Sequence, residues 1–170
     1  MIQSAHISLA SSPADLANAA VLFREYVASL PFPLDYQDFE NEVANLPGKY
    51  AQPKGCILIA WQRTGLDQLP VGCIAMRPID LSSLRAGDIE PVCEMKRMYV
   101  KPAARGLRLG RLLAERLLEE ARKSGYRMMK LDTETTFTAA TTLYRSLGFV
   151  ECERYNDDPQ PDTIWMRLKL

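Results

Sequence analysis

The first fifty residues of the chain place their hydrophobic side chains at the spacing of helices. After a short strand-like run at His6–Leu9, apolar residues recur every three or four positions between residues 11 and 31, which predicts an amphipathic helix. Ser12 is its candidate N-cap. We expect a second, shorter helix within residues 31–50, entered through a proline-rich turn and ended by a Leu-Pro-Gly sequence.

The next fifty residues contain continuous apolar runs instead, and these predict three strands. The runs occupy residues 55–62, 69–79 and 91–100, and we expect a hairpin loop at 63–68 between the first two. Alternation along the third run assigns its side chains to two faces of a sheet. One face is expected to carry Cys93, Met95, Arg97 and Tyr99, and the other Glu94, Lys96 and Met98.

The rest of the chain alternates helical and strand patterns. We predict a helix after residue 108, a strand at 126–133, a helix at 138–148, and final strands at 149–155 and 163–170 around the acidic loop 156–162. The buried stripe of the first of these helices is expected to consist of Leu109, Leu112, Leu113, Leu117 and Ala121. The order of elements predicts an α/β fold, with helices packed on one mixed sheet.

Composition excludes several classes of protein. Lys+Arg and Asp+Glu both number 21 in 170 residues, so the chain lacks the overall positive charge of most nucleic-acid binders. The four cysteines lie far apart and His6 is the one histidine, so no metal site is expected. Neither a leader-like segment nor a long apolar run is visible. We expect one soluble, cytoplasmic domain over residues 1–170, without a membrane partner and with its cysteines mostly buried as small hydrophobic side chains.

Positive charge is nevertheless concentrated in one segment. Residues 96–111 contain six basic residues and no acidic one. Here a proline ends the strand, Gly106 and Gly110 let the backbone approach a ligand closely, and a helix begins, whose first N–H groups favour an anion. We interpret the segment as a phosphate site with Arg105, Arg108 and Arg111 as charge partners. It matches neither a Walker A loop nor a Rossmann fingerprint, and the glycine spacing alone fits a plain turn and helix start equally well.

Two motifs resemble those of a known family. V-K-P-A-A-R-G-L-R-L-G-R-L-L at residues 100–113 and A-T-T-L-Y-R-S-L-G-F at 140–149 resemble the GNAT superfamily of N-acetyltransferases, over roughly residues 55–155 in all. The segment C-E-M-K-R-M-Y-V-K-P-A-A-R-G is similar to a common bacterial subgroup. The resemblance implies the GNAT fold, a sheet of about six to seven strands, splayed in the middle and flanked by about four helices. It also implies acetyl-CoA as co-substrate, an amine as acceptor and no metal.

The resemblance also implies a set of cofactor-binding residues. The family's loop has the form Gln/Arg-x-x-Gly-x-Gly/Ala; Arg105 matches its first position and Gly110 its last, but Arg108 replaces the middle glycine. The strand residues Met98, Tyr99 and Val100 would pair with the pantetheine arm, and Thr133 would lie across the splayed gap. The implied loop residues are Arg105, Gly106, Leu107, Arg108, Leu109, Gly110 and Arg111.

The resemblance implies catalytic residues as well. Tyr144 corresponds to the tyrosine that protonates the departing CoA thiolate, although packing on a helix face would also explain an aromatic residue here. Glu94 is the candidate general base for the acceptor amine, and Glu134 and Asp132 are the alternatives. Glu94 could instead pair with Lys96 or with a basic residue on an adjacent strand.

Several questions of function stay open at this point. The acceptor is undefined, although the loop with Asp157, Asp158 and Asp162 would border its entrance and could attract a cationic amine. The main alternative to an enzyme is a non-catalytic acyl-CoA-binding sensor of the same fold, which Arg108 favours and Tyr144 disfavours. RNA binding through the arginine-rich segment is disfavoured by the zero net charge. The final strands, exposed in this family, could form a homodimer.

Overall fold

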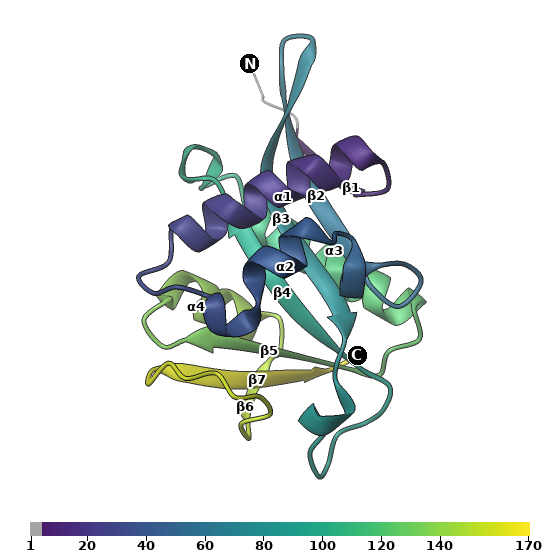
Figure 1. Cartoon of the computed structure of the whole chain (residues 1–170), viewed down its shortest axis with the longest axis vertical. Coiled ribbons are helices and arrows are strands. Elements are labelled where there is room, and N and C mark those ends of the chain that lie inside the picture. The colour runs from purple at the N-terminus through teal and green to yellow at the C-terminus, as the bar shows by residue number, and fades with distance from the viewer. Residues whose placement is uncertain (1–4) are drawn as a thin grey trace.

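The computed structural model describes residues 5–170, in which seven strands and four helices form one α/β structure (Figure 1). The strands are β1 (Ala5–Leu9), β2 (Cys56–Thr64), β3 (Asp67–Pro78), β4 (Val92–Val100), β5 (Met128–Glu134), β6 (Val150–Cys152) and β7 (Thr163–Lys169). The helices are α1 (Pro13–Ala28), α2 (Phe39–Ala44), α3 (Leu109–Lys123) and α4 (Thr138–Ser146). The sheet has the order β1-β2-β3-β4-β5-β7-β6, and all neighbours are antiparallel except the parallel pair β4–β5. The predicted mixed sheet is confirmed.

Local sequence signals determine where α1 begins and why α2 is short. The Ser12 hydroxyl accepts a hydrogen bond from the Asp15 N–H, and the Asp15 carboxylate accepts one from the Ser12 N–H, so a capping box confirms the predicted N-cap. The helix expected within residues 31–50 is limited to the six residues of α2, with 3-10 turns before and after it. Prolines on both sides restrict it, because proline cannot continue a helical hydrogen-bond ladder.

The β2–β3 hairpin is longer and its loop shorter than predicted. Thr64 pairs with Asp67, so the loop consists of Gly65 and Leu66 rather than residues 63–68. Gly65 has a φ of +64°, which glycine adopts without steric cost, and this allows the two-residue connection. The hairpin extends beyond the layers of helices at one end of the molecule (Figure 1).

The strand predicted at 149–155 is also wrong in extent. Only Val150–Cys152 pairs with β7. The chain then leaves the edge of the sheet and carries Tyr155 into the interior, where its side chain is 1% exposed. Its hydroxyl donates to Glu94 Oε1 at 2.9 Å, so a buried polar contact ends the strand.

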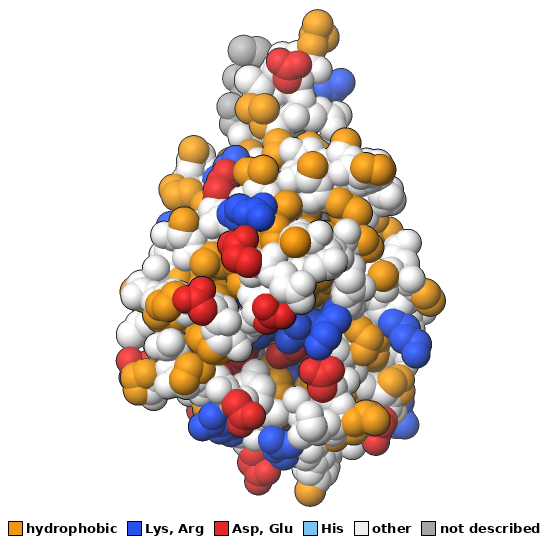
Figure 2. Space-filling view, in the orientation of Figure 1, with side chains coloured by type: hydrophobic (Ala, Val, Ile, Leu, Met, Phe, Trp, Pro, Cys, Tyr) orange, Lys and Arg blue, Asp and Glu red, His pale blue; other side chains and the backbone are white. Residues whose placement is uncertain are grey.

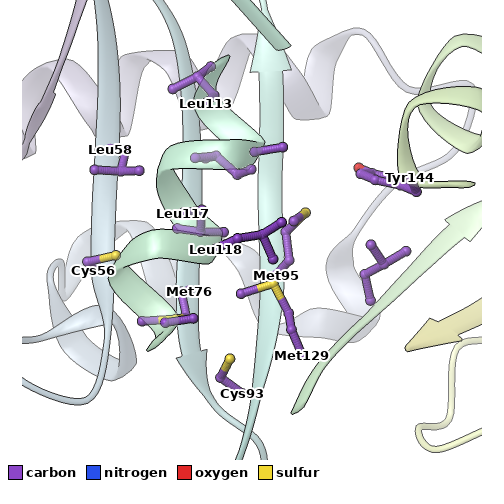
Figure 3. Close-up of a cluster of buried hydrophobic side chains, with 14 of the residues drawn as sticks. Cys56, Leu58, Met76, Cys93, Met95, Leu113, Leu117, Leu118, Met129 and Tyr144 are labelled. Atoms are coloured by element: carbon purple, nitrogen blue, oxygen red, sulfur yellow. The ribbon is translucent and has the colours of Figure 1, made fainter. Parts of the chain in front are cut away.

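Helices cover both faces of the sheet, with α1 and α2 on one face and α3 on the other (Figure 1). Figure 3 shows Leu113, Leu117 and Leu118 of α3 packed over the sheet. The predicted stripe is correct except for Leu112, which is 46% exposed, because the helical period directs the buried side toward Leu118 instead. In the described part of the chain, no helix is long and apolar enough to cross a membrane.

The thiols mostly follow the prediction. Cys56, Cys73 and Cys93 are buried free cysteines, whereas Cys152 is partly exposed because β6 is an edge strand. Burial raises the pKa of all four thiols, so they remain protonated and poorly nucleophilic at neutral pH. They therefore serve as small packing side chains.

A β-bulge in β4 overturns the predicted alternation of this strand. Ala75 pairs with Lys96 and Cys73 with Tyr99, so two residues of β4, Arg97 and Met98, stand opposite one residue of β3. Arg97 has a φ of 58°, in the left-handed region. Beyond the bulge the faces are exchanged: Met98 packs on the α3 side with Met95, whereas Tyr99 packs on the α1 side.

The bulge is held in place by a buried ion pair with α2. The Arg97 guanidinium donates to both carboxylate oxygens of Glu42, at 2.7 and 3.0 Å, and to Gln37 Oε1 at 2.9 Å. It also lies 5.3 Å from the centre of the Phe39 ring. These contacts explain how a non-glycine residue maintains a left-handed backbone conformation here.

β4 and β5 separate after a short stretch of pairing. Only Val92–Glu94 pairs with Met128–Lys130, whereas β5 pairs with β7 along its whole length. Beyond these residues the two strands diverge (Figure 1), which leaves the facing edges of Met95–Val100 and Leu131–Glu134 without a neighbouring strand within residues 5–170. The predicted splay is confirmed, and it creates an opening in the middle of the sheet.

The ion pair between α2 and the bulge should contribute measurably to stability. We expect Glu42→Gln to lower the free energy of unfolding by about 3 kcal/mol, because it leaves the buried Arg97 charge uncompensated. Glu40→Gln is the matched control on the same helix, since its carboxylate is 77% exposed, and it should change stability by less than about 0.5 kcal/mol. Urea unfolding measures both; equal effects of the two variants would contradict the assignment.

Candidate active site

Two cavities adjoin where β4 and β5 separate. The larger, of about 580 Å³, lies between the end of β4, the loop that follows it, the first turn of α3, and α4; we call it the outer cleft. The smaller, of about 100 Å³, lies between the separated parts of β4 and β5; we call it the inner cavity. Both are lined by Tyr26, Met98, Phe137 and Ala140. The two cavities therefore meet at these four side chains.

The outer cleft contains most of the residues that the sequence assigned to cofactor binding. Those that line it are Met98, Tyr99, Val100, Arg105, Gly106, Arg108, Leu109 and Gly110. Leu107 and Arg111 do not line it: Leu107 is 43% exposed, and Arg111 donates to Glu115 Oε1 at 3.2 Å and to Ser146 Oγ. Thr133 lines the inner cavity instead.

The first turn of α3 presents unpaired backbone donors to the outer cleft. Its first helical hydrogen bond runs from the Leu112 N–H to the Arg108 carbonyl, at 3.1 Å, and no side chain caps the helix. The N–H groups of residues 109–111 precede this bond and lack intrahelical acceptors. Together with the positive end of the helix dipole, they form a site for an anionic group.

Backbone geometry explains the residues of the loop. Gly106 has a φ of +86°, and a Cβ there would meet no atom within 4 Å, so the space beside it is open. A Cβ on Gly110 would lie 3.1 Å from Met98 Cε, so a side chain there would displace Met98. Arg108 has a φ of 58°, a left-handed conformation that costs a non-glycine residue about 1 kcal/mol. The backbone of Arg108 is therefore strained, and its side chain adds a positive charge to the cleft.

The arginines lie in mixed rather than uniformly positive surroundings. Arg105 Nε donates to the Val100 carbonyl at 3.4 Å, and Lys101 pairs with Glu25 at 3.1 Å. On the face that α1 and α2 cover, basic and acidic side chains are interspersed (Figure 2). This pattern suits a local anion better than the extended backbone of a nucleic acid.

Tyr144 extends from α4 toward β4 (Figure 3). Its hydroxyl donates to Met98 Sδ at 3.3 Å, and its ring packs edge-on against Phe149. The side chain is 6% exposed, and burial raises the pKa of its hydroxyl, so the proton stays in place at neutral pH. Because a thioether is a weak acceptor, this proton is available to a stronger acceptor in the cavity.

A buried ion pair connects the two separated strands. Lys96 Nζ donates to Asp132 Oδ1 at 2.9 Å. Burial alone would raise the pKa of Asp132, but the Lys96 charge and hydrogen bonds from Lys96 and Asn156 outweigh it and hold this pKa below its usual value. Burial would likewise lower the pKa of Lys96, but the charges of Asp132 and Glu94 keep it raised. Both groups are therefore ionised at neutral pH, and the Asp132 carboxylate is engaged in the ion pair with Lys96.

Glu94 is occupied by structural contacts. Its Oε2 accepts from Arg77 Nε and Nη2, each at 2.9 Å, and its Oε1 accepts from the Tyr155 hydroxyl. The side chain is 5% exposed, and Lys96 Nζ lies 3.6 Å away. It lines neither the outer cleft nor the inner cavity. The expected pairing with Lys96 is present, but the shorter contacts are to Arg77, on the adjacent strand.

Glu134 lines the inner cavity from the end of β5. Its Oε1 accepts from the Thr163 hydroxyl at 2.7 Å, and the same hydroxyl lies 3.0 Å from Asp158 Oδ1. Burial raises the pKa of Glu134, with smaller contributions from nearby carboxylates, of which Asp158 is the largest. A carboxylate with a raised pKa in a cavity is suited to accept a proton near neutral pH.

Several residues of the site were not found by sequence reasoning. Thr163, Tyr155 and Arg77 contact the candidate residues Glu134 and Glu94 only through tertiary structure. No motif or regular spacing in the sequence marks these positions, because each lies in a different segment of the chain. Within residues 5–170, no group of three or more histidine, cysteine or acidic side chains could hold a metal ion.

The known sequences and structures that are similar to this chain include several acetyltransferases. A sequence model described as the Acetyltransferase (GNAT) family matches residues 20–149. The chain is 37% identical to an uncharacterised N-acetyltransferase of Schizosaccharomyces pombe over 96% of this chain and 94% of the relative. A solved acetyltransferase of Streptococcus agalactiae is 25% identical over 98% of each chain, with a TM-score of 0.70.

A further structural neighbour was solved with a ligand. The Salmonella typhimurium protein yncA, in complex with its cofactor acetyl-CoA, has a TM-score of 0.71 to this chain and is 22% identical. The similarity covers 98% of this chain and 94% of that one. At this level of identity the comparison establishes a shared fold.

Two substitutions at Arg108 separate backbone strain from charge. Arg108→Gly and Arg108→Ala both remove the guanidinium, but only alanine retains a Cβ at a positive φ. We expect the glycine variant to be more stable than the alanine variant by about 1 kcal/mol in urea unfolding. A more stable alanine variant would mean that this residue does not hold the left-handed conformation in solution.

Proposed function

The chain belongs to the GNAT acetyltransferase family, as its motifs suggested, and we propose that it transfers the acetyl group of acetyl-CoA to a primary amine by direct attack in a ternary complex. The observation that carries this proposal is the position of Tyr144. It lies in the inner cavity beside Met98, and Met98 also lines the outer cleft in front of the uncapped α3 terminus. A cofactor anchored at α3 would thus extend to the Tyr144 hydroxyl.

The cofactor site follows from the donors in the outer cleft. The pyrophosphate would bind the N–H groups at the start of α3, with Arg105 and Arg108 as charge partners. The pantetheine arm would lie along the free edge of Met98–Val100, and Thr133 would face it from β5. The residues present therefore fit acetyl-CoA, which supplies the activated acyl group as a thioester.

The chemistry requires one bond to form and one to break. The amine nitrogen attacks the thioester carbonyl carbon, the new C–N bond forms, and the C–S bond breaks to release the CoA thiolate. Tyr144 would donate its proton to that thiolate, and a base would take the proton of the amine. Backbone N–H groups near Met98 would stabilise the negative charge on the carbonyl oxygen. Orientation of amine and thioester in one cleft would supply much of the remaining rate enhancement.

For the base, the geometry favours Glu134 over Glu94 and Asp132. Glu134 lines the inner cavity, whereas the carboxylate of Glu94 accepts from Arg77 and Tyr155, and that of Asp132 is paired with Lys96. A protonated Glu134 could donate to Thr163 Oγ, whose own proton could then turn toward Asp158 Oδ1. Thr163 is thus placed to accommodate both protonation states of Glu134.

Substituting Tyr144 tests the proposed acid. We expect Tyr144→Phe to lower kcat by about a hundredfold, because a positioned proton donor is lost, while the Kd for CoA measured by calorimetry stays unchanged. Tyr126→Phe is the control: it removes a buried hydroxyl that donates to the Lys54 carbonyl, outside the residues that line the two cavities. An unchanged kcat in Tyr144→Phe would refute the role of Tyr144. CoA binding by a wild-type protein that turns over no amine would favour the sensor function instead.

The pH dependence of kcat/KM tests the proposed base. Glu134 must be ionised to accept a proton, and its pKa is raised, so activity should increase with pH through a value above that of an ordinary glutamate. Glu134→Gln should abolish this increase of kcat/KM with pH and should lower kcat. Glu94→Gln should mainly lower the free energy of unfolding. If a folded Glu94→Gln variant lost the increase of kcat/KM with pH and Glu134→Gln kept it, the base would be Glu94.

A further inference from the structure

We propose that the acceptor is a cationic amine with no carboxylate beside its amino group, bound in the inner cavity between aromatic rings and the carboxylates of Glu134 and Asp158. This inference rests on the proposed function, since it assigns the inner cavity to the acceptor. It goes further by defining the charge of the molecule that enters. The pairing of the charged side chains in the cavity determines which charge is favoured there.

Five charged side chains line the inner cavity: Lys96, Arg97, Asp132, Glu134 and Asp158. Both cations are already neutralised by carboxylates. Lys96 pairs with Asp132 at 2.9 Å, and Arg97 donates all its described hydrogen bonds to Glu42 and Gln37. In the part of the chain that the structure describes, Glu134 and Asp158 have no cationic partner within 4.0 Å, and their hydrogen bonds come from neutral groups. The cavity thus has an excess of negative charge.

The two carboxylates also share a donor. The Thr163 hydroxyl lies within hydrogen-bond distance of both Glu134 Oε1 and Asp158 Oδ1, but it carries a single proton. When both groups are ionised, it can serve only one of them. The side chains are buried, at 6% exposure for Glu134 and 7% for Asp158. Asp158 Oδ1 also accepts from the Gln160 N–H at 2.9 Å, so the cost of ionising both groups is their mutual repulsion. An ammonium group, with a positive charge and three N–H donors, would offset this repulsion.

Aromatic rings form another part of the cavity wall. Phe32 and Phe137 are stacked with ring centres 6.4 Å apart, and Tyr26, Tyr36 and Tyr144 also line the cavity. The Tyr36 hydroxyl donates to Asp158 Oδ2 at 3.0 Å, which connects this wall to the acidic pair. The faces of aromatic rings attract cations, and their surface also accommodates an apolar body. The wall therefore favours an amine carried on an apolar or aromatic group.

The same pairing disfavours an amino acid as acceptor. The carboxylate of a zwitterion would need a cationic or hydrogen-bonding partner after leaving water. Lys96 and Arg97 are the cations that line the cavity. Breaking the Lys96 pair would leave Asp132 uncompensated, and breaking the Arg97 pair would leave Glu42 with only a 4.0 Å contact to Arg77. The carboxylate would also be repelled by Glu134 and Asp158. An amine, or an amino group whose neighbouring carboxylate is an amide, avoids both costs.

Matched acceptors test this directly. We would measure kcat/KM with 2-phenylethylamine, phenylalaninamide and phenylalanine. Phenylalaninamide has the shape of phenylalanine without its negative charge, so it separates charge from size. Each cationic compound should be preferred over its carboxylate counterpart by at least about tenfold, as the loss of one charge interaction implies. Equal or better use of phenylalanine than of phenylalaninamide would overturn the inference and leave the acetyltransferase proposal standing.

A pair of variants tests the role of Asp158. Asp158→Asn should raise the KM for the amine about tenfold and leave the KM for acetyl-CoA unchanged. Asp157→Asn is the matched control, because it removes the same charge from the neighbouring residue of the same loop, whose side chain is fully exposed. Equal amine KM values in Asp158→Asn and Asp157→Asn would contradict the assignment.

A binding measurement keeps the inference separate from catalysis and from folding of the variants. Calorimetry on wild-type protein saturated with CoA should detect phenylalaninamide but not phenylalanine. If no compound is acetylated yet phenylalaninamide alone binds, the acetyltransferase proposal fails and the inference about charge holds. If neither compound is acetylated or bound, or if both bind equally, the inference is overturned.

Discussion

The site depends on one constraint, the early separation of β4 from β5. Three residue pairs hold the two strands together, and a sheet that continued to pair would leave no room for a ligand between them. β5 stays fixed to β7 along its whole length, so the strand diverges without losing its own support. On the other side, the bulge at Arg97 and Met98 directs Met98 toward Tyr144 and away from α1. The outer cleft and the inner cavity both follow from this separation.

Two buried ion pairs lie near the point where backbone pairing between β4 and β5 stops. Glu94 pairs with Arg77 across β3 and β4, and Lys96 pairs with Asp132 across the gap itself. Such pairs contribute little net stability, because desolvation offsets much of their attraction. Here the pairs hold the charged side chains in fixed positions. They also leave an excess of negative charge in the inner cavity. Among the described residues, Glu134 and Asp158 are the carboxylates of the inner cavity that lack a cationic partner within 4.0 Å.

The order of the elements could be predicted from local sequence patterns, whereas the splay and the proposed cofactor loop were implied by the resemblance to a known family. Helical spacing defined α1, α3 and α4, and two motifs placed residues 105–110 and Tyr144. The bulge could not be predicted, since strict alternation assumes an unbroken strand, and one extra residue moved Met98 to the other face. The environments of Glu94 and Glu134 depend on partners from distant elements, and no local pattern identifies those partners.

The most direct test of the central claim, that the separated strands and the α3 terminus bind acetyl-CoA, is the melting temperature of the protein with and without about 1 mM acetyl-CoA. For a Kd near about 10 μM, the ligand should add about 2.7 kcal/mol of stability, which corresponds to roughly 5 to 10 °C for a chain of this size. Free CoA should give a comparable shift and ATP little. No shift with either acetyl-CoA or CoA would contradict the account, because the α3 terminus would then not bind the cofactor.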